Sequence, residues 1–125
     1  MPRQSTLMTQ FPPAFNTPII RAGEWLIVSG QLPMRDGALV EGGIAAETAQ
    51  VIANIEQLLA AENACLSDVA KVSVFLADLD DYPVMNQTMA ERFGDHRPAR
   101  TTVGARLVRG ARVEMEAWAY LGRQP

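Results

Sequence analysis

Apolar residues along this chain follow first a two-residue period and then a helical one, and the change of period predicts the elements. Residues 17–21 and 24–29 are rich in β-branched and aromatic side chains, which predicts a β-hairpin that turns at Gly23. Residues 44–62 then carry apolar side chains at every third or fourth position, which predicts a long amphipathic helix. Glu47 lies mostly off the apolar stripe of that helix.

A second strand and a second helix follow. Residues 71–77 are apolar on both faces, as expected of a central strand. The run Asp78-Leu-Asp-Asp81 supplies N-cap chemistry, and Gly94 is a suitable end for the helix that follows it. The predicted buried face of this shorter helix consists of Met85, Met89 and Phe93.

Two last strands are predicted at residues 100–107 and 112–120, paired around a turn at Arg109-Gly110. The order ββαβαββ indicates an α+β fold, with two helices packed on one face of a mixed sheet. Side chains such as Trp118 and Tyr120 then point to the opposite face, and association with another chain is the natural way to cover it.

Length and composition narrow the picture further. A chain of 125 residues is expected to form a single domain, residues 1–125, in which the proline-punctuated residues 1–16 are a loosely ordered lead-in. A pocket wholly inside so small a domain would compete with the core, so a site shared between subunits is expected. Asp and Glu outnumber Lys and Arg by 14 to 11, and no basic patch favours a nucleic-acid partner.

One cysteine and one histidine leave no pattern for a disulfide or a Cys/His metal cluster. The N-terminus lacks the apolar region of a signal peptide, and no stretch is apolar enough to span a bilayer. We therefore expect a cytoplasmic protein without a metal or a membrane partner. Cys65 is expected to fill a small apolar space near a helix end, and His96 to face solvent.

Arg100 and Glu114 are the candidates for chemistry. Arg100 follows Pro98-Ala99 at a strand start, where it could hold a carboxylate through two parallel hydrogen bonds or form a surface salt bridge. Glu114 lies in mid-strand, where it could be a general acid/base in a partly desolvated site or belong to a solvated face. If the last two strands form a hairpin, these side chains lie more than ~10 Å apart. They could then share a ligand only through a bulge or through two subunits.

Several motifs together resemble the reactive intermediate deaminase family (Rid, also called YjgF). The resemblance runs from about residue 16 to residue 121, and its most specific parts are the Ser-Gly-Gln turn, the Pro-Ala-Arg-Thr segment and the spacing from Arg100 to Glu114. The matching segments are Ser29-Gly-Gln-Leu-Pro33, Asn54, residues 69–79, Val84-Met-Asn86, Arg97-Pro-Ala-Arg-Thr101 and Val113-Glu-Met-Glu-Ala117.

The resemblance implies a chorismate-mutase-like (YjgF-like) fold and a homotrimer with ligand clefts between subunits. It also implies cofactor-independent hydrolysis of small-molecule enamines and imines, such as 2-aminoacrylate, to a 2-keto acid and ammonia. In that family Arg100 corresponds to the carboxylate-binding arginine and Glu114 to the glutamate that positions or activates water. The positions that correspond to cleft-lining residues are Ser29, Gly30 and Asn86.

Two substitutions depart from the family pattern. Asn16 stands where a tyrosine usually lines the cleft, and Thr102 stands where a cysteine is common. Both positions belong to the expected substrate-binding set, so the changes bear on which imine is bound. They also keep open an alternative, a non-catalytic small-carboxylate-binding or regulatory protein on the same fold. An RNA-directed activity is a third interpretation, against which the acidic charge balance counts.

Overall fold

The computed structural model describes residues 15–122, so all but the end of the predicted lead-in at residues 1–16 lies outside it. The described chain begins with strands β1 (Ile19–Ala22) and β2 (Trp25–Gln31), which pair antiparallel. Gly23 makes the turn between them with a φ of 60°, a left-handed conformation that glycine adopts without steric cost. The predicted hairpin is confirmed.

The long helix α2 runs over Gly43–Ala60, two residues shorter at its C-terminal end than predicted. A small hairpin of strands β3 (Met34–Arg35) and β4 (Ala38–Leu39) precedes it. The residues of α2 that pack into the core recur at helical spacing. These fully buried side chains are Val51, Ile52, Ile55 and Leu59.

A 3₁₀ turn at Leu66–Asp68 leads into strand β5 (Val69–Leu76). A second 3₁₀ turn, Leu79–Asp81, precedes helix α3 (Tyr82–Phe93). Met85, Met89 and Phe93 of α3 are buried, as predicted. Gly94 ends this helix with a φ of 65°, which confirms it as the helix stop.

The last two strands are β6 (Ala99–Gly104) and β7 (Val113–Tyr120), and the prediction that they pair with each other is wrong. The sheet order is β1-β2-β7-β5-β6, so β5 lies between them. The crossover through α3 places β6 parallel to β5 at the edge of the sheet. The segment that includes the 3₁₀ turn Val108–Gly110 then returns the chain to the centre, where β7 pairs antiparallel with both β2 and β5.

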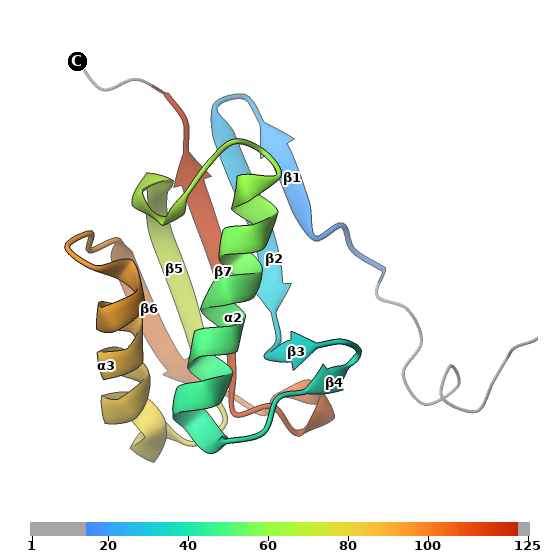
Figure 1. Cartoon of the computed structure of the whole chain (residues 1–125), viewed down its shortest axis with the longest axis vertical. Helices are drawn as coiled ribbons and strands as arrows, with labels where there is room; N and C mark the ends of the chain where they lie inside the picture. Colours follow the sequence, from blue (N-terminus) through green and yellow to red (C-terminus); the bar gives the residue numbers. More distant parts are fainter. Residues whose placement is uncertain (1–14, 123–125) are drawn as a thin grey trace, which may run out of the picture.

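Helices α2 and α3 both cover one face of the five-stranded sheet (Figure 1), which confirms the predicted α+β architecture. The core lies between the helices and this face, because alternate residues of the central strands point toward it. On β7 these residues are Val113, Met115, Ala117 and Ala119, all buried. No helix within residues 15–122 is long and apolar enough to cross a bilayer.

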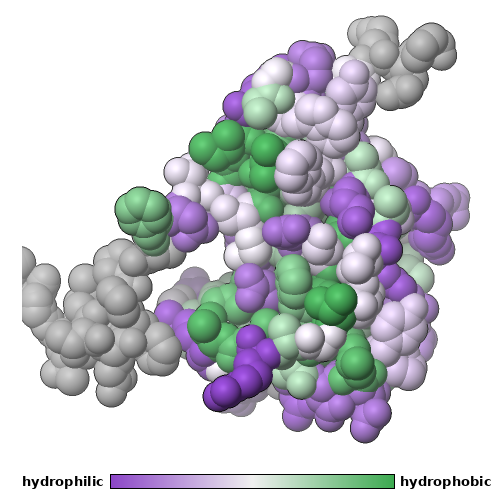
Figure 2. Space-filling view, turned by 180° about the vertical axis from the view of Figure 1, so that it is seen from behind, coloured by the Kyte–Doolittle hydropathy of each residue, from purple (hydrophilic) through white to green (hydrophobic). Residues whose placement is uncertain are grey.

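The opposite face of the sheet carries no helix, and Figure 2 views the molecule from that side. Apolar patches interrupt its polar surface. Trp118 is 41% exposed there and Val103 is 43% exposed. We call this surface, formed by the outward side chains of β2, β7, β5 and β6, the open sheet face. The prediction of large apolar side chains on the face away from the helices is confirmed for Trp118.

Candidate functional site

Arg100 lies on the edge strand β6 and points to the helix-covered face. It pairs with Val72 of β5, whose side chain is buried beneath the helices. Its Nη1 atom donates a hydrogen bond to Asn86 Oδ1 at 2.8 Å, and its Nη2 atom donates one to the Tyr82 hydroxyl at 2.6 Å. Two polar groups of α3 therefore fix the plane of the guanidinium group.

The positive charge of Arg100 is held in place without being neutralised. The two ion pairs found within residues 15–122 involve other arginines, so the alternative of a surface salt bridge at Arg100 is not realised among those residues. The guanidinium carbon also lies 5.3 Å from the centre of the Tyr82 ring, within the range of a cation–π contact. A guanidinium group with five N–H donors keeps several of them available for an anion.

Tyr82 is a contributor that the sequence analysis missed. Tyr82 and Asn86 are four residues apart on α3, so they lie one above the other on one face of the helix. Met89 continues this face, and its sulfur lies 3.7 Å from Arg100 Nη1. The spacing of residues 82, 86 and 89 could have indicated this contact, because it places two polar side chains and a methionine on the same face of the helix.

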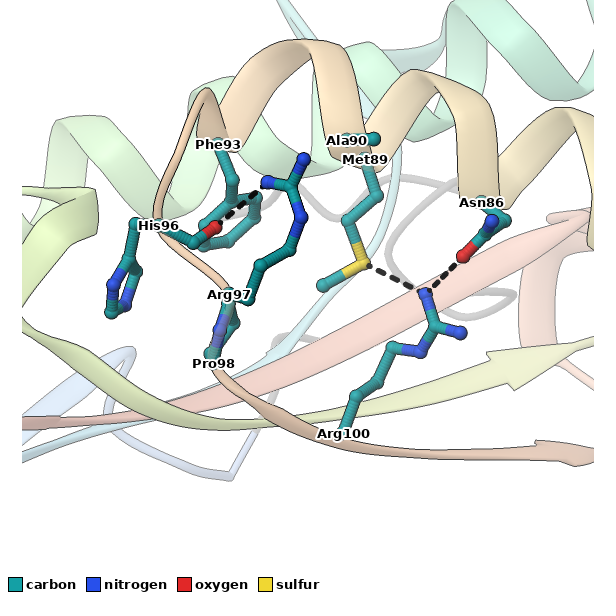
Figure 3. A pocket seen from close by; sticks show the side chains of 8 residues that line it. All are labelled: Asn86, Met89, Ala90, Phe93, His96, Arg97, Pro98 and Arg100. Carbon is teal, nitrogen blue, oxygen red and sulfur yellow. Dashed lines mark hydrogen bonds between the residues drawn. The ribbon is translucent and has the colours of Figure 1, made fainter.

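A hollow of about 320 Å³ opens between α3 and the start of β6. Figure 3 shows Asn86 and Met89 reaching down from the helix toward the Arg100 guanidinium group. Arginine, aromatic and thioether side chains line it together. Its lining residues are Asn86, Met89, Ala90, Phe93, His96, Arg97, Pro98 and Arg100.

Glu114 lies on the other side of the sheet, half-buried on β7. Burial raises the pKa of its carboxyl group, and the negative charge of Glu116 raises that pKa further. This shift moves the pKa of the carboxyl group toward neutral pH, and a general acid or base is most effective when its pKa lies near the working pH. Among the described residues it is the group with a clearly shifted pKa.

Gly30 allows the Glu114 carboxylate its position. A β-carbon placed on Gly30 would overlap the Oε2 atom of Glu114. The pairing of β2 with β7 is irregular between Val28 and Gln31, so Ser29 and Gly30 form a bulge opposite β7. The Ser29 hydroxyl donates a 2.6 Å hydrogen bond to the carbonyl of Thr17, which ties the segment next to the exposed Asn16 to this bulge.

Apart from Asn16, which precedes β1, the predicted site residues thus fall into two groups on opposite faces of the sheet. Arg100, Asn86 and Thr102 belong to β6 and α3, and the buried Thr102 hydroxyl has no hydrogen-bond partner among the described residues. Ser29, Gly30 and Glu114 belong to β2 and β7. Glu114 pairs with Phe75, and Phe75 pairs with Val103, three residues beyond Arg100. That separation is roughly 10 Å along the strands and roughly 10 Å across them.

Glu47 is a second residue whose role the sequence pattern did not reveal. Although it lies off the predicted apolar stripe, it is only 7% exposed, and its Oε1 atom accepts a 2.8 Å hydrogen bond from the backbone N–H of Arg112. Arg112 immediately precedes β7. Glu47 therefore fastens α2 to the start of the strand that carries Glu114.

Two smaller expectations are corrected. Cys65 is exposed instead of filling an apolar space, because it precedes the 3₁₀ turn Leu66–Asp68 and its backbone N–H is bonded to the Asp68 carboxylate at 2.9 Å. His96 is half-buried instead of solvent-facing, since its Nε2 atom lies 2.6 Å from the carbonyl of Val69. Within residues 15–122, no three His, Cys, Asp or Glu side chains are grouped so that they could hold a metal ion.

The chain thus has a two-layer α+β fold. An arginine without an ion pair within residues 15–122 lies on its edge strand, and a half-buried glutamate lies on its open sheet face. The family model described as endoribonuclease L-PSP matches residues 10–121. The chain belongs to this family, the YjgF/Rid family, and the predicted resemblance is confirmed.

Individual relatives carry different descriptions. A RutC family protein of Pyrococcus horikoshii is 42% identical over 81% of this chain and 82% of its own length. A 2-iminobutanoate/2-iminopropanoate deaminase of Dermatophagoides farinae is 39% identical over 78% of this chain and 79% of its own length. The crystal structure of RidA from an Antarctic Psychrobacter superimposes with a TM-score of 0.80 at 33% identity, covering 87% of this chain and 92% of that one.

Gly30→Ala is predicted to impair the site while the chain still folds. The backbone of Gly30 does not require a positive φ, so the added methyl group acts by displacing the Glu114 carboxylate. We expect any activity that depends on Glu114 to fall by about tenfold or more, with an unfolding free energy lowered by about 1–3 kcal/mol. Gly104→Ala is the matched control, because the atoms nearest to its methyl group would be those of the exposed Leu79 side chain, the first at 3.2 Å. Equal activities of the two variants would contradict the prediction.

Proposed function

We propose that this protein hydrolyses reactive imines and enamines that carry a carboxylate, giving a 2-keto acid and ammonia. The observation that carries the proposal is Arg100, whose guanidinium group is fixed by Asn86 and Tyr82 but has no ion pair within residues 15–122. Such a group binds a carboxylate through two parallel, charge-assisted hydrogen bonds. The deaminase name of the Dermatophagoides relative supports the same reaction class.

Glu114 would supply the proton transfers. The Glu114 carboxylate takes a proton from water while the water oxygen bonds to the electrophilic carbon of the protonated imine, and the C=N electron pair moves to nitrogen. The resulting carbinolamine receives that proton on nitrogen. The C–N bond then breaks, its electron pair leaves with ammonia, and the hydroxyl group gives its proton to the Glu114 carboxylate as the keto C=O bond forms. Glu114 passes this proton to the departing ammonia, which leaves as ammonium and restores the carboxylate. Protonated imine and water are consumed, and keto acid and ammonium are released.

Two chains are needed to build such a site. Arg100 and Glu114 of one chain lie on opposite faces of the sheet with β5 between their strands. A ligand as small as aminoacrylate cannot reach both. If the β6 edge of one subunit meets the open sheet face of the next, Arg100 of the first faces Glu114 of the second. We therefore propose that the site lies between subunits, in the homotrimer that the family resemblance implies. Such an assembly would also cover the exposed Trp118.

The direct test generates imines in the presence of the protein. An amino-acid oxidase converts an amino acid to its imine, and the rate of keto-acid formation is compared with the spontaneous rate. We expect acceleration that depends on Arg100. If no carboxylate-bearing imine is hydrolysed faster than in buffer, the proposed reaction is wrong.

The same experiment tests the alternative of a non-catalytic carboxylate-binding protein. Thr102, with its buried and unpaired hydroxyl, and the exposed Asn16 distinguish this chain within the expected substrate-binding set. Saturable binding of a keto acid that requires Arg100, without acceleration of imine hydrolysis, would favour that alternative.

A further inference from the structure

The hollow beside α3 contains a second guanidinium group that the proposed reaction does not use. Arg97 lies in the loop between α3 and β6, and both Arg97 and Arg100 line the hollow. No Asp or Glu lines it, and neither arginine forms an ion pair within residues 15–122. Figure 3 shows both side chains rising toward α3 from one stretch of chain. The hollow is therefore strongly cationic, although the whole chain has a net charge of −3.

Arg97 is held in position, but its donors are only partly used. Its Nη1 atom donates to the carbonyl of Gly94 and, at 3.0 Å, to the carbonyl of His96. His96 is itself anchored by the 2.6 Å contact of its Nε2 atom with the carbonyl of Val69. The Nε and Nη2 atoms of Arg97 make none of these bonds, so they can donate to an anion without rearrangement of the loop.

The surface between the two guanidinium groups is apolar. Met89 and Ala90 of α3 line the hollow between Asn86 and Phe93. Figure 3 shows the Arg97 guanidinium group near Phe93 and the Arg100 guanidinium group near Asn86, with Met89 between them. The hollow thus offers a cation at either end of a short apolar stretch, which matches a short carbon chain with a carboxylate at each end.

We propose that this hollow binds dicarboxylates. Arg100 takes the carboxylate next to the reacting carbon, and Arg97 takes a carboxylate at the far end of the carbon chain. Combined with the proposed function, on which this extension rests, the preferred substrates are imines derived from amino acids with an acidic side chain. Arg97 then determines specificity, whereas Arg100 serves every carboxylate-bearing ligand.

Arg97 also has a structural interpretation. Because it contacts the carbonyl of Gly94, its charge lies at the C-terminal end of α3, where a cation stabilises the helix. A purely structural role would affect stability, and every ligand to the same degree. A dicarboxylate site would affect only ligands with the second carboxylate.

Isothermal titration calorimetry with two keto acids separates the structural role of Arg97 from its role in a dicarboxylate site. 2-Oxoglutarate extends 2-oxobutanoate by a terminal carboxylate, so the pair isolates the contribution of that group. We expect 2-oxoglutarate to bind about tenfold more tightly, and this preference to weaken as salt is added. Arg97→Gln should abolish the preference while 2-oxobutanoate binding is unchanged. Arg92→Gln removes a charge from the same helix outside this hollow and should leave the binding of both keto acids unchanged.

Each outcome bears on one proposal in a defined way. Equal affinity of wild type for the two keto acids, no binding of 2-oxoglutarate, or an equal loss of both ligands in Arg97→Gln would overturn the dicarboxylate site. Arg100-dependent hydrolysis of monocarboxylate imines would leave the proposed function standing in each of those cases. Conversely, an Arg97-dependent preference for 2-oxoglutarate without imine hydrolysis would support the site and reject the reaction.

Discussion

Replacing Arg100 by alanine is expected to lower kcat/KM for a carboxylate-bearing imine by about 10²–10⁴-fold. The loss follows from two charge-assisted hydrogen bonds, each contributing about 1.5–3 kcal/mol. Arg100→Lys keeps the charge but loses the planar pair of donors, so we expect an intermediate value. The measurement is the initial rate of keto-acid formation with imine generated by an oxidase.

Arg106→Ala provides the matched control for this variant. Arg106 is exposed beyond the end of β6, and it lines none of the hollows described for residues 15–122. Its loss removes the same charge from the same stretch of chain and should leave kcat/KM near the wild-type value. Full activity in Arg100→Ala, or an equal loss in both variants, would remove the basis for the proposed substrate contact.

Glu114→Gln is expected to lower kcat by about 10²–10⁴-fold, the range typical of a lost general acid/base. Glutamine keeps the volume of the side chain against Gly30, so the loss reports the proton transfer and not a cavity. KM should change little, because the carboxylate of the ligand is held by Arg100. A Glu114→Gln protein with wild-type kcat would show that water is activated elsewhere.

The pH dependence of wild type gives an independent view of Glu114. Glu114 must be ionised to accept a proton, so activity falls as the pH drops through its pKa. Because burial and Glu116 both raise that pKa, the fall should begin at a higher pH than for an ordinary glutamate. Glu116→Gln removes the second cause and should move the acidic limb of the kcat/KM profile to lower pH. A shift in the opposite direction would contradict the role of Glu114 as the base.

The fold was largely predictable because burial follows local periodicity. The apolar stripe of α2, the alternation in β7 and the spacing of Met85, Met89 and Phe93 each fix which face is buried. Strand pairing is not local in this sense. The strands at 99–104 and 113–120 were found near their predicted positions, yet nothing in their own residues shows that β5 separates them.

Only part of the site could be predicted, again because the pairing of strands is not a local property of the sequence. The identities of Arg100, Glu114 and Gly30 stand out in the sequence, but the face to which each side chain points depends on the register with neighbouring strands. Tyr82 and Glu47 were missed because their roles arise from contacts between elements, with β6 and with the start of β7 respectively. The residues around Glu47 in the sequence give no sign that its carboxylate will be buried and will accept a hydrogen bond from a distant backbone N–H.

The central claim is that one active site takes Arg100 from one chain and Glu114 from another, and complementation tests it most directly. Arg100→Ala and Glu114→Gln proteins, each nearly inactive alone, are mixed in equal amounts, unfolded, refolded together and assayed. In a randomly mixed cyclic homotrimer, about a quarter of the sites would combine both intact residues. We predict recovery of about a quarter of the wild-type activity. A mixture no more active than its separate components, with mixed oligomers shown to form, would contradict the claim.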